Sequence, residues 1–195
     1  MLNNEFPLRT SSSYELDILF DHVKKMYSKY AELANLNIHI DNFYPRNKFG
    51  QLLAKGPIIT YHVMRRRAAS MKNPFSDQFV RPDPYVLSTQ YTPNQATLNR
   101  RMYFDNIVRF AIAATSYETA ILTADNFESF MIIAKDIALQ NGLPELYLWE
   151  RSEDETEEIS NTIVYFVNID YYVRTAKDFV RDEAIIREIT TVLKS

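Results

Sequence analysis

Two histidines and an aspartate are the residues of this 195-residue chain that could hold a metal ion. His39 and His62 lie in two short segments with strand character, and Asp41 follows His39 by two positions. Imidazole and carboxylate groups are the ligands of catalytic zinc sites, so these residues would suit a metal-dependent nuclease. Their spacing matches no specific metal motif, and histidine is common on the exposed side of strands. We therefore expect no metal ion and no catalytic residue here.

The densest group of carboxylates is the acidic run over residues 150–158, which includes Glu153, Asp154 and Glu155. A catalytic pair of carboxylates needs two environments that separate their pKa values, and neighbouring solvated carboxylates do not provide them. A calcium-binding loop would need a twelve-residue pattern with a central glycine, which this run lacks. We interpret the run as a solvated surface loop, with a docking surface for a basic partner as the alternative.

Five arginines flank a long segment of the chain: Arg65, Arg66 and Arg67 enter it, and Arg100 and Arg101 leave it. If the flanking strands are neighbours, five guanidinium groups meet at one end of a sheet, where they could bind carboxylates or phosphates in a bidentate way. Three interpretations stay open: scattered surface charge, an interface with acidic residues of another subunit or partner, and contact with DNA.

Charge is distributed unevenly along the chain, although the net charge is only -3. Residues 1–100 hold 13 basic and 8 acidic side chains, whereas residues 101–195 hold 9 and 17. The two halves are either separate solvated faces or a complementary pair of surfaces, and the second arrangement favours a ring of identical subunits joined head to tail. The weakly acidic total argues against general binding of nucleic acid.

Scarce glycine and absent cysteine exclude several classes of enzyme. With Gly50, Gly56 and Gly142 as its three glycines, the chain has no dinucleotide-binding fingerprint, P-loop or nucleophile elbow. Without cysteine it has no disulfide, no thiolate nucleophile and no cysteine-ligated metal. No apolar run reaches the roughly 18 residues of a membrane span, and the first residues do not resemble a signal peptide. We expect a protein that is not an enzyme, needs no cofactor and does not bind membranes.

Hydrophobic periodicity predicts an α+β fold: one domain over residues 1–195, with a mostly antiparallel sheet and helices packed on one face. Helical spacing predicts helices over residues 13–34, 117–140 and 177–193, the second ended by Gly142 in the left-handed region. Residues 67–99 contain four prolines and are expected to form a long loop arm, with one edge strand near residues 85–91. The other expected strands cover residues 36–40, 58–66, 102–114, 146–150 and 163–173.

The last expected strand has two apolar faces. Tyr171 and Val173 should enter the core, so Phe166, Tyr172 and Arg174 should face the other way. A second apolar face needs cover from another helix or another subunit. Tyrosine and arginine are enriched in interfaces, so an interface is favoured over an active site here.

One series of segments gives the chain a distinctive pattern: Pro57–Tyr61 followed by Arg65–Arg67, then Asn73–Ser76 with Arg81–Pro82, Phe104–Phe110, Asn126–Met131, Leu146–Arg151 and Tyr171–Thr175. This series covers about residues 55–175. It resembles the small neck proteins of bacteriophages with contractile tails, of the tail-terminator or tail-completion kind.

The resemblance implies an α+β subunit that forms a six-fold ring on the finished tail, stops tail polymerisation and offers a surface to the head connector. Its partners would be further copies of itself, the tail tube and sheath proteins, and the connector or other neck proteins. DNA would only pass through the lumen. The protein would be assembled in the host cytoplasm and reside in the virion. Candidate residues for the subunit and partner interfaces are Arg65, Arg66, Arg67, Arg81, Arg100, Arg101, Glu153, Asp154, Glu155, Tyr172 and Arg174.

Two other functions stay open from the sequence. One is a head-completion or connector adaptor, which would form a twelve-fold ring on the portal side of the neck. The other, from a different class, is a metal-dependent nuclease that uses His39, His62 and nearby carboxylates.

Overall fold

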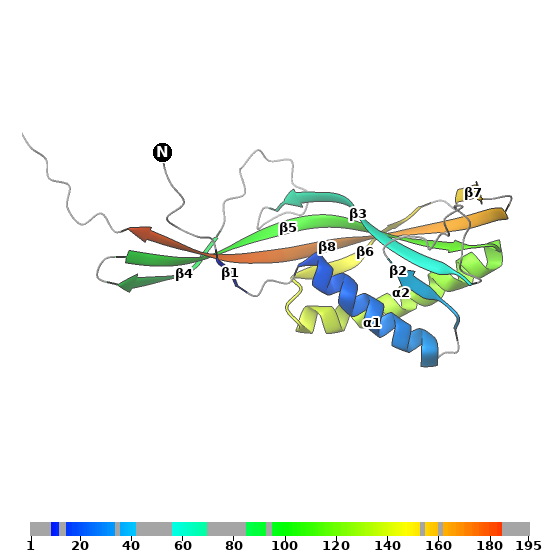
Figure 1. Cartoon of the computed structure of the whole chain (residues 1–195), viewed down its shortest axis with the longest axis horizontal. Coiled ribbons are helices and arrows are strands. Elements are labelled where there is room, and N and C mark those ends of the chain that lie inside the picture. The colour runs from blue at the N-terminus through cyan, green and yellow to red at the C-terminus, as the bar shows by residue number, and fades with distance from the viewer. Residues whose placement is uncertain are drawn as a thin grey trace, which may run out of the picture.

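The computed structural model of the chain describes residues 9–11, 15–33, 36–41, 56–69, 85–92, 95–152, 155–159 and 162–184. Two helices and an eight-stranded sheet make up this part, which confirms the predicted α+β class (Figure 1). In the described residues no helix is both long and apolar enough to cross a membrane. The elements are β1 (Arg9–Ser11), α1 (Leu16–Leu33), β2 (His39–Asp41), β3 (Ile58–Ala68), β4 (Tyr85–Thr92), β5 (Gln95–Ala114), α2 (Tyr117–Gln140), β6 (Glu145–Arg151), β7 (Glu155–Ile159) and β8 (Thr162–Ala184).

Two very long strands, β5 and β8, form the centre of the sheet. They pair antiparallel without a register shift from Gln95 opposite Ala184 to Ala114 opposite Tyr165. On the far side of β5 lie β3 and β4, and on the far side of β8 lie β1, β6 and β7. Every strand pair is antiparallel except β2 with β3. The prediction of a mostly antiparallel sheet is thus confirmed.

Both helices pack against one face of the sheet, as predicted, and the core lies between the helices and that face. Apolar residues at every second position of the strands form the sheet side of this core, because alternate residues of a strand point to the same face. The buried aromatic rings meet here: Phe127 of α2 lies 4.9 Å from Phe110 and 5.3 Å from Tyr27 between ring centroids. The buried sheet residues that face the helices are Ile40, Ile59, Val108, Phe110, Ile112, Ala114, Leu146, Val167, Ile169, Tyr171 and Val173.

The helices cover only one half of the sheet, and the other half extends as a narrow arm (Figure 1). In the arm, β4 flanks Gln95–Arg101 of β5, and β1 flanks the end of β8 at Asp178–Val180. Of the expected loop over residues 67–99, residues 85–92 and 95–99 belong to the arm, residues 67 and 68 end β3, and residues 70–84 and 93–94 lie outside the described part. The prediction of an edge strand near residues 85–91 is confirmed, but the irregular conformation predicted for residues 95–99 is wrong because these residues pair on both sides.

Several local predictions are confirmed. The helices expected over residues 13–34 and 117–140 are α1 and α2. Gly142 follows α2 with a φ of +98°, the left-handed conformation that glycine adopts without strain. Of the strand expected over residues 36–40, only His39 and Ile40 are in a strand, β2.

The predicted last helix over residues 177–193 is wrong over the residues that the structure describes. Instead β8 continues as a strand to Ala184 because Gln95–Met102 of β5 provides a backbone partner for each of its residues from Lys177 on. Residues 185–195 lie outside the described part. The acidic run is not a loop throughout either: residues 155–159 form β7, a hairpin partner of β8. Glu153 and Asp154 lie outside the described residues.

Candidate functional site

Three ion pairs form a ladder on the face of the sheet opposite the helices. Its members lie at every fourth residue of β5 and β8, and each pair consists of direct neighbours in the antiparallel register. Because four residues correspond to two full alternations of a strand, all six side chains project from the same face. The three pairs, which we call the charge ladder, are Arg101–Asp178, Asp105–Arg174 and Arg109–Asp170.

The outer two pairs of the charge ladder are bidentate. Arg101 donates from Nε and Nη2 to the two carboxylate oxygens of Asp178 at 2.5 and 2.7 Å. Arg109 donates to both oxygens of Asp170 at 2.8 Å. These hydrogen bonds raise the pKa of both guanidinium groups above the ordinary arginine value, so both arginines stay charged. The planar fork of arginine matches a carboxylate in this geometry.

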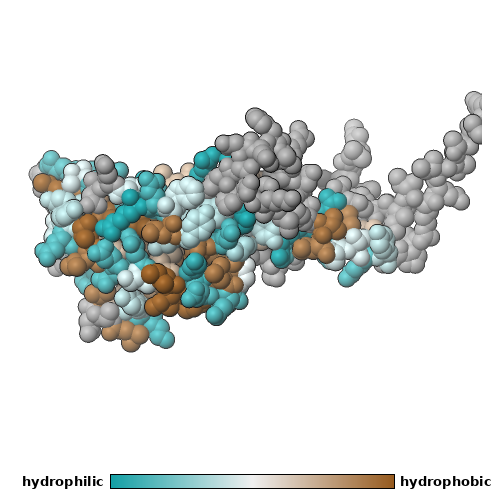
Figure 2. All heavy atoms as spheres, turned by 180° about the vertical axis from the view of Figure 1, so that it is seen from behind, coloured by the Kyte–Doolittle hydropathy of each residue, from teal (hydrophilic) through white to brown (hydrophobic). Residues whose placement is uncertain are grey.

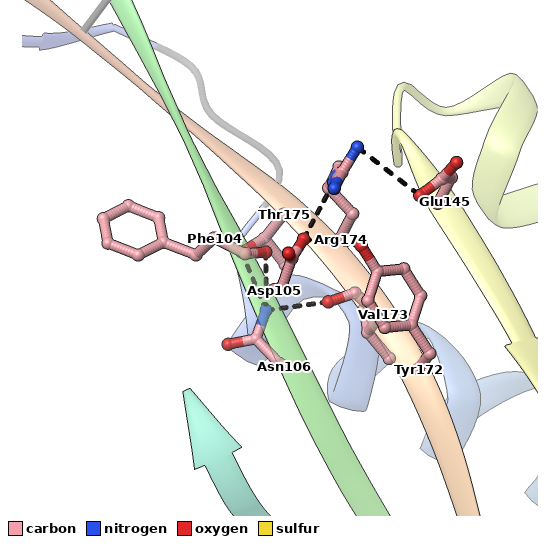
Figure 3. Close-up of polar contacts among 8 residues, drawn as sticks. All are labelled: Phe104, Asp105, Asn106, Glu145, Tyr172, Val173, Arg174 and Thr175. Carbon is pink, nitrogen blue, oxygen red and sulfur yellow. Dashed lines mark hydrogen bonds and ion pairs between the residues drawn. The ribbon is translucent and has the colours of Figure 1, made fainter. Parts of the chain in front are cut away.

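The central pair, Asp105–Arg174, is buried, and a tyrosine hydroxyl also donates to its carboxylate (Figure 3). Arg174 donates from Nε to Oδ1 of Asp105 at 2.8 Å, and the hydroxyl of Tyr172 donates to the same oxygen at 2.5 Å. Asp105 is 1% exposed, Tyr172 0% and Arg174 8%. Nη1 of Arg174 also lies 3.7 Å from Oε2 of Glu145 on β6. One guanidinium group therefore lies between two carboxylates from different strands.

The pKa values of Arg174 and Tyr172 in this cluster are both shifted upward. Burial alone lowers the pKa of Arg174, but the hydrogen bond to Asp105 and the neighbouring negative charges outweigh it, and the net shift is upward. Burial and the hydrogen bond to Asp105 raise the pKa of Tyr172, so its hydroxyl keeps its proton and remains a donor. At neutral pH Arg174 therefore stays charged and the Tyr172 hydroxyl stays protonated. Neither group titrates in the range that general acid–base catalysis requires.

The central pair belongs to a row of alternating charge that crosses four strands. Arg67 of β3 lies opposite Asp105 of β5, Asp105 lies opposite Arg174 of β8, and Arg174 lies opposite Glu145 of β6. We call these four residues the charged row. It begins with a positive residue on one outer strand of the sheet and ends with a negative residue on the other. A neighbouring row contains His62, Arg109, Asp170 and Glu150 in the same strand order.

The predicted arginine cluster is only partly assembled. β3 and β5 are neighbours, as that prediction required, but Arg101 lies three positions beyond Phe104, the last residue of β5 in the β3 register. There Arg101 is paired with Asp178 rather than with the other arginines. Arg66 lies over the ring of Phe104, with its guanidinium carbon 4.6 Å from the ring centroid. Arg100 lies opposite Val86 of β4, and Arg81 lies outside the described residues.

The prediction that Phe166, Tyr172 and Arg174 face away from the helices is consistent with the register, in which they alternate with the core residues Tyr171 and Val173. Tyr172 is covered within the chain itself: the ring of Tyr147 stacks on it at 4.6 Å, and Trp149 lies 6.3 Å away. Both covering residues come from β6. Glu155, another candidate interface residue, is exposed on β7.

The residues of the imagined metal site are separated. His39 is paired with Ile58 at the start of β3, whereas His62 lies four positions further along β3, opposite Arg109. Asp41 accepts from Lys24 at 3.3 Å. Among the residues that the structure describes, no group of three His, Cys, Asp or Glu side chains could hold a metal ion.

Sequence reasoning missed the acidic members of the charge ladder, Asp105, Asp170 and Asp178, together with Arg109. The available signal is their spacing: charged residues occur at positions 101, 105 and 109, and again at 170, 174 and 178, with alternating sign in each series. A four-residue spacing is also typical of salt bridges along a helix. Only the pairing of the two strands identifies the partners.

Two hollows and several exposed apolar residues complete the surface. A hollow of about 200 Å³ beside the charged row is lined by Tyr103, Pro144, Glu145 and Arg174. A mostly apolar groove of about 210 Å³ lies between α2 and β6, with Ile132 and Leu148 among its lining residues. Figure 2 shows hydrophobic patches among hydrophilic residues over the helical half. No protein-family model matches the chain, and no curated protein matches it significantly.

Proposed function

We propose that this chain is a structural subunit of the neck of a contractile-tailed bacteriophage, a tail terminator that forms a ring on the tail tube and sheath and joins them to the head connector. The observation that carries the proposal is the arm, in which β4, β5 and β8 continue well past the helical layer. It supports a role in assembly, in line with the resemblance of residues 55–175 to neck proteins.

The arm is longer than the chain's own core requires. Strands of globular proteins usually have about 5–6 residues, whereas β5 has 20 and β8 has 23. The helices cover only part of this length. An extended sheet that carries little core of its own is suited to reach another protein.

The arm also exposes large apolar side chains. On β4, Val86 is 54% exposed, Leu87 51% and Tyr91 76%. Exposed apolar groups close together are typical of surfaces that a partner covers. They give the end of the arm an exposed apolar surface, at a distance from the helical half.

The helical half offers a second surface. Leu122, Ile132 and Ile133 of α2 are between 55% and 71% exposed. A subunit with one apolar area on an arm and another on its body can contact two different neighbours at once. The proposed neck ring requires this, because each subunit would touch other copies, the tail and the head connector.

The experiment is removal of the gene from the phage, followed by electron microscopy of the particles. We expect tails of uncontrolled length or finished tails that do not join heads, and we expect the protein to appear in the wild-type virion as a six-fold ring at the head-proximal end of the tail. Normal joined virions without the protein would overturn the proposal. A twelve-fold ring on the portal would instead identify a head-completion adaptor, and metal-dependent DNA cleavage lost in His39→Ala would identify a nuclease.

A matched pair of variants tests the role of the arm. Leu87→Ser with Tyr91→Ser removes apolar surface from the arm, whereas Leu33→Ser removes apolar surface from the end of α1, outside both contact surfaces, and should complement. We expect the arm variant to fail in complementing the deletion although it folds normally. Full complementation by the arm variant would contradict the assigned role of the arm.

A further inference from the structure

We infer that copies of this chain join edge to edge, the outer edge of β3 in one copy pairing antiparallel with the outer edge of β6 in the next. This inference deepens the proposed function, since it specifies how subunits of the ring would contact each other. Its partner is a second copy of this chain. Four observations carry it: two open edges, their opposite charge, their compatible direction and their common level in the sheet.

The first observation is that β3 is an outer strand over most of its length. β2 pairs with it only at Ile58–Thr60, and from Tyr61 on no other described strand lies on that side. Residues 62–66 are all exposed, including Val63 at 40% and Met64 at 48%. A strand enclosed between two neighbours would bury every second residue on the core face. The outward backbone groups of an edge strand are a template for another strand.

The opposite margin of the sheet is open in the same way. In the described part β6 pairs with β8 alone. Residues 148–151 are all exposed, with Leu148 at 47% and Trp149 at 48%. Each margin therefore combines exposed apolar residues with an outer side on which no other described strand is paired.

The second observation is the opposite charge of the two edges. The β3 edge carries Arg65, Arg66 and Arg67, and the β6 edge carries Glu145 and Glu150. The single arginine of the β6 edge, Arg151, is engaged elsewhere: it donates to Asp125 at 2.9 Å and to Glu128 at 3.2 Å on α2. β7, next in the chain, adds exposed Glu155, Glu157 and Glu158. Two β3 edges would repel each other, as would two β6 edges, so only the mixed pairing is favoured.

The third observation is strand direction. β3 is antiparallel to β5, β5 to β8, and β8 to β6, so β3 and β6 run in opposite directions within one copy. A second copy placed beside the first in the same orientation therefore presents β6 antiparallel to β3. The sheet would continue from one copy into the next. Because the two contacting surfaces differ, the contact is head to tail and closes into a ring when the rotation between copies permits.

The fourth observation is that the charged positions of the two edges lie at the same height along the strands. The charged row runs from Arg67 on β3 to Glu145 on β6 through direct neighbours, and Arg65 is connected in the same way to Tyr147. Placing the copies side by side at one level sets Arg67 of the first beside Glu145 of the second. The alternation of charge in the row then continues without interruption. Both edges have a register shift just beyond this stretch, between Val63 and Arg65 and between Leu148 and Glu150. The regular pairing is therefore limited to residues 65–67 opposite 145–147, and Val63 and Leu148 share the next level.

A charge-swap experiment tests the contact on the purified full-length chain by sedimentation at low ionic strength. Variant one is Arg65→Glu with Arg66→Glu, and variant two is Glu145→Lys with Glu150→Lys. We expect each variant alone to self-associate at least about tenfold more weakly than the wild type, since like charges then face each other. A mixture of the two should regain association, because both kinds of contact in an alternating assembly are again complementary.

Matched controls carry the same charge changes away from the edges. Lys25→Glu with Lys29→Glu and Glu32→Lys with Asp136→Lys alter exposed residues of the helices and should leave association unchanged. Circular dichroism spectra of all variants establish that they fold. Equal loss in the control variants, or a mixture that stays as dissociated as its components, would overturn the inference.

A crosslinking experiment tests the geometry even where association is weak. The chain has no cysteine, so introduced pairs report without background. In the double variant Val63→Cys with Leu148→Cys, the thiol on the β3 edge of one copy lies level with the thiol on the β6 edge of the next copy. Oxidation should therefore give a ladder of disulfide-linked multimers. Val63→Cys with Leu33→Cys is the control, because Leu33 is 77% exposed at the end of α1 and does not line the groove beside β6. A ladder in the control that is as strong as in the edge pair would overturn edge pairing.

The outcomes separate this inference from the proposed function. An edge-specific ladder from a protein whose deletion leaves phage tails normal would support the contact and overturn the neck function. A ring at the tail end in which copies touch through α2 rather than through β3 and β6 would support the function and overturn the contact.

Discussion

Asp105 of β5 and Arg174 of β8 lie opposite each other in the antiparallel register, and Nε of Arg174 donates to Oδ1 of Asp105 at 2.8 Å. Their side chains are 1% and 10% exposed. Asp105→Asn leaves a buried guanidinium without its main counter-charge, and we expect it to lower the free energy of unfolding by about 3–5 kcal/mol. Urea unfolding followed by circular dichroism measures the loss.

The matched control for this prediction is a salt bridge of similar type on the surface. Lys24 and Asp41 are 3.3 Å apart, and their side chains are 43% and 44% exposed. Asp41→Asn should cost about 0–1 kcal/mol, because water already screens the pair. Equal effects of the two substitutions would show that burial does not strengthen the dependence of Arg174 on Asp105.

Arg101 and Asp178 hold the two central strands together where the arm begins. Their side chains are 35% and 13% exposed, so the pair is partly screened by solvent. We expect Arg101→Gln to change the global free energy of unfolding by about 1 kcal/mol or less. Amide hydrogen exchange should nevertheless become faster in the arm, at Asp178–Val180 and at Leu98–Arg101, while the amides of Val167–Val173 keep their protection. Faster exchange throughout the sheet would contradict this local role.

His62 should titrate below the ordinary histidine pKa of about 6.5. Partial desolvation of its ring, which remains exposed on one side, lowers its pKa, and the positive charge of Arg109 on the neighbouring strand lowers it further. The unfolded chain then binds a proton more readily than the folded chain. The contribution of His62 to stability is therefore fully present above about pH 6.5 and declines as the pH falls below that value.

Nuclear magnetic resonance of the His62 ring measures this pKa directly. In Arg109→Gln the His62 pKa should rise, because a positive neighbour is lost and the negative Asp170, which raises it, remains. An unchanged pKa in this variant would assign the shift to burial alone. His62→Gln should flatten the pH dependence of unfolding between about pH 5 and 7.

Phe127 connects the two helices to the sheet at the centre of the aromatic core. It is 0% exposed and contacts rings from α1, α2 and β5, with Tyr27 at 5.3 Å and Phe110 at 4.9 Å. Phe127→Ala should lower the free energy of unfolding by about 3–5 kcal/mol, through lost burial and the cavity that remains. Ile132→Ala on the outer side of the same helix is the control and should stay within about 0.5 kcal/mol.

The sequence by itself determined the elements whose pattern is local. Helical spacing defines α1 and α2, alternation defines the helical half of β5 and β8, and Gly142 marks the end of α2. These signals depend on residues a few positions apart, and burial on one side of a helix or strand makes them strong. The α+β class follows from their order along the chain.

Local pattern could not determine the end of β8. Ile185, Ile186 and Ile189 have helical spacing, which predicts a helix over residues 177–193. The strand to Ala184 depends on hydrogen bonds with Gln95–Met102, more than 70 positions earlier in the chain. β-structure is governed by such partners more than by intrinsic preference, and the same holds for β7, which forms from acidic residues because β8 pairs with it.

The charge ladder likewise depends partly on local sequence and partly on strand pairing. The sequence supplies arginines and aspartates at four-residue spacing, and it singled out Tyr172 and Arg174 as residues of the face opposite the core. Which arginine meets which aspartate is decided by the register of β5 on β8, and a shift by one residue would send all six side chains to the other face. The sequence therefore determines the helices, the alternation and the charges, whereas the partners of those charges exist only once the two longest strands have paired.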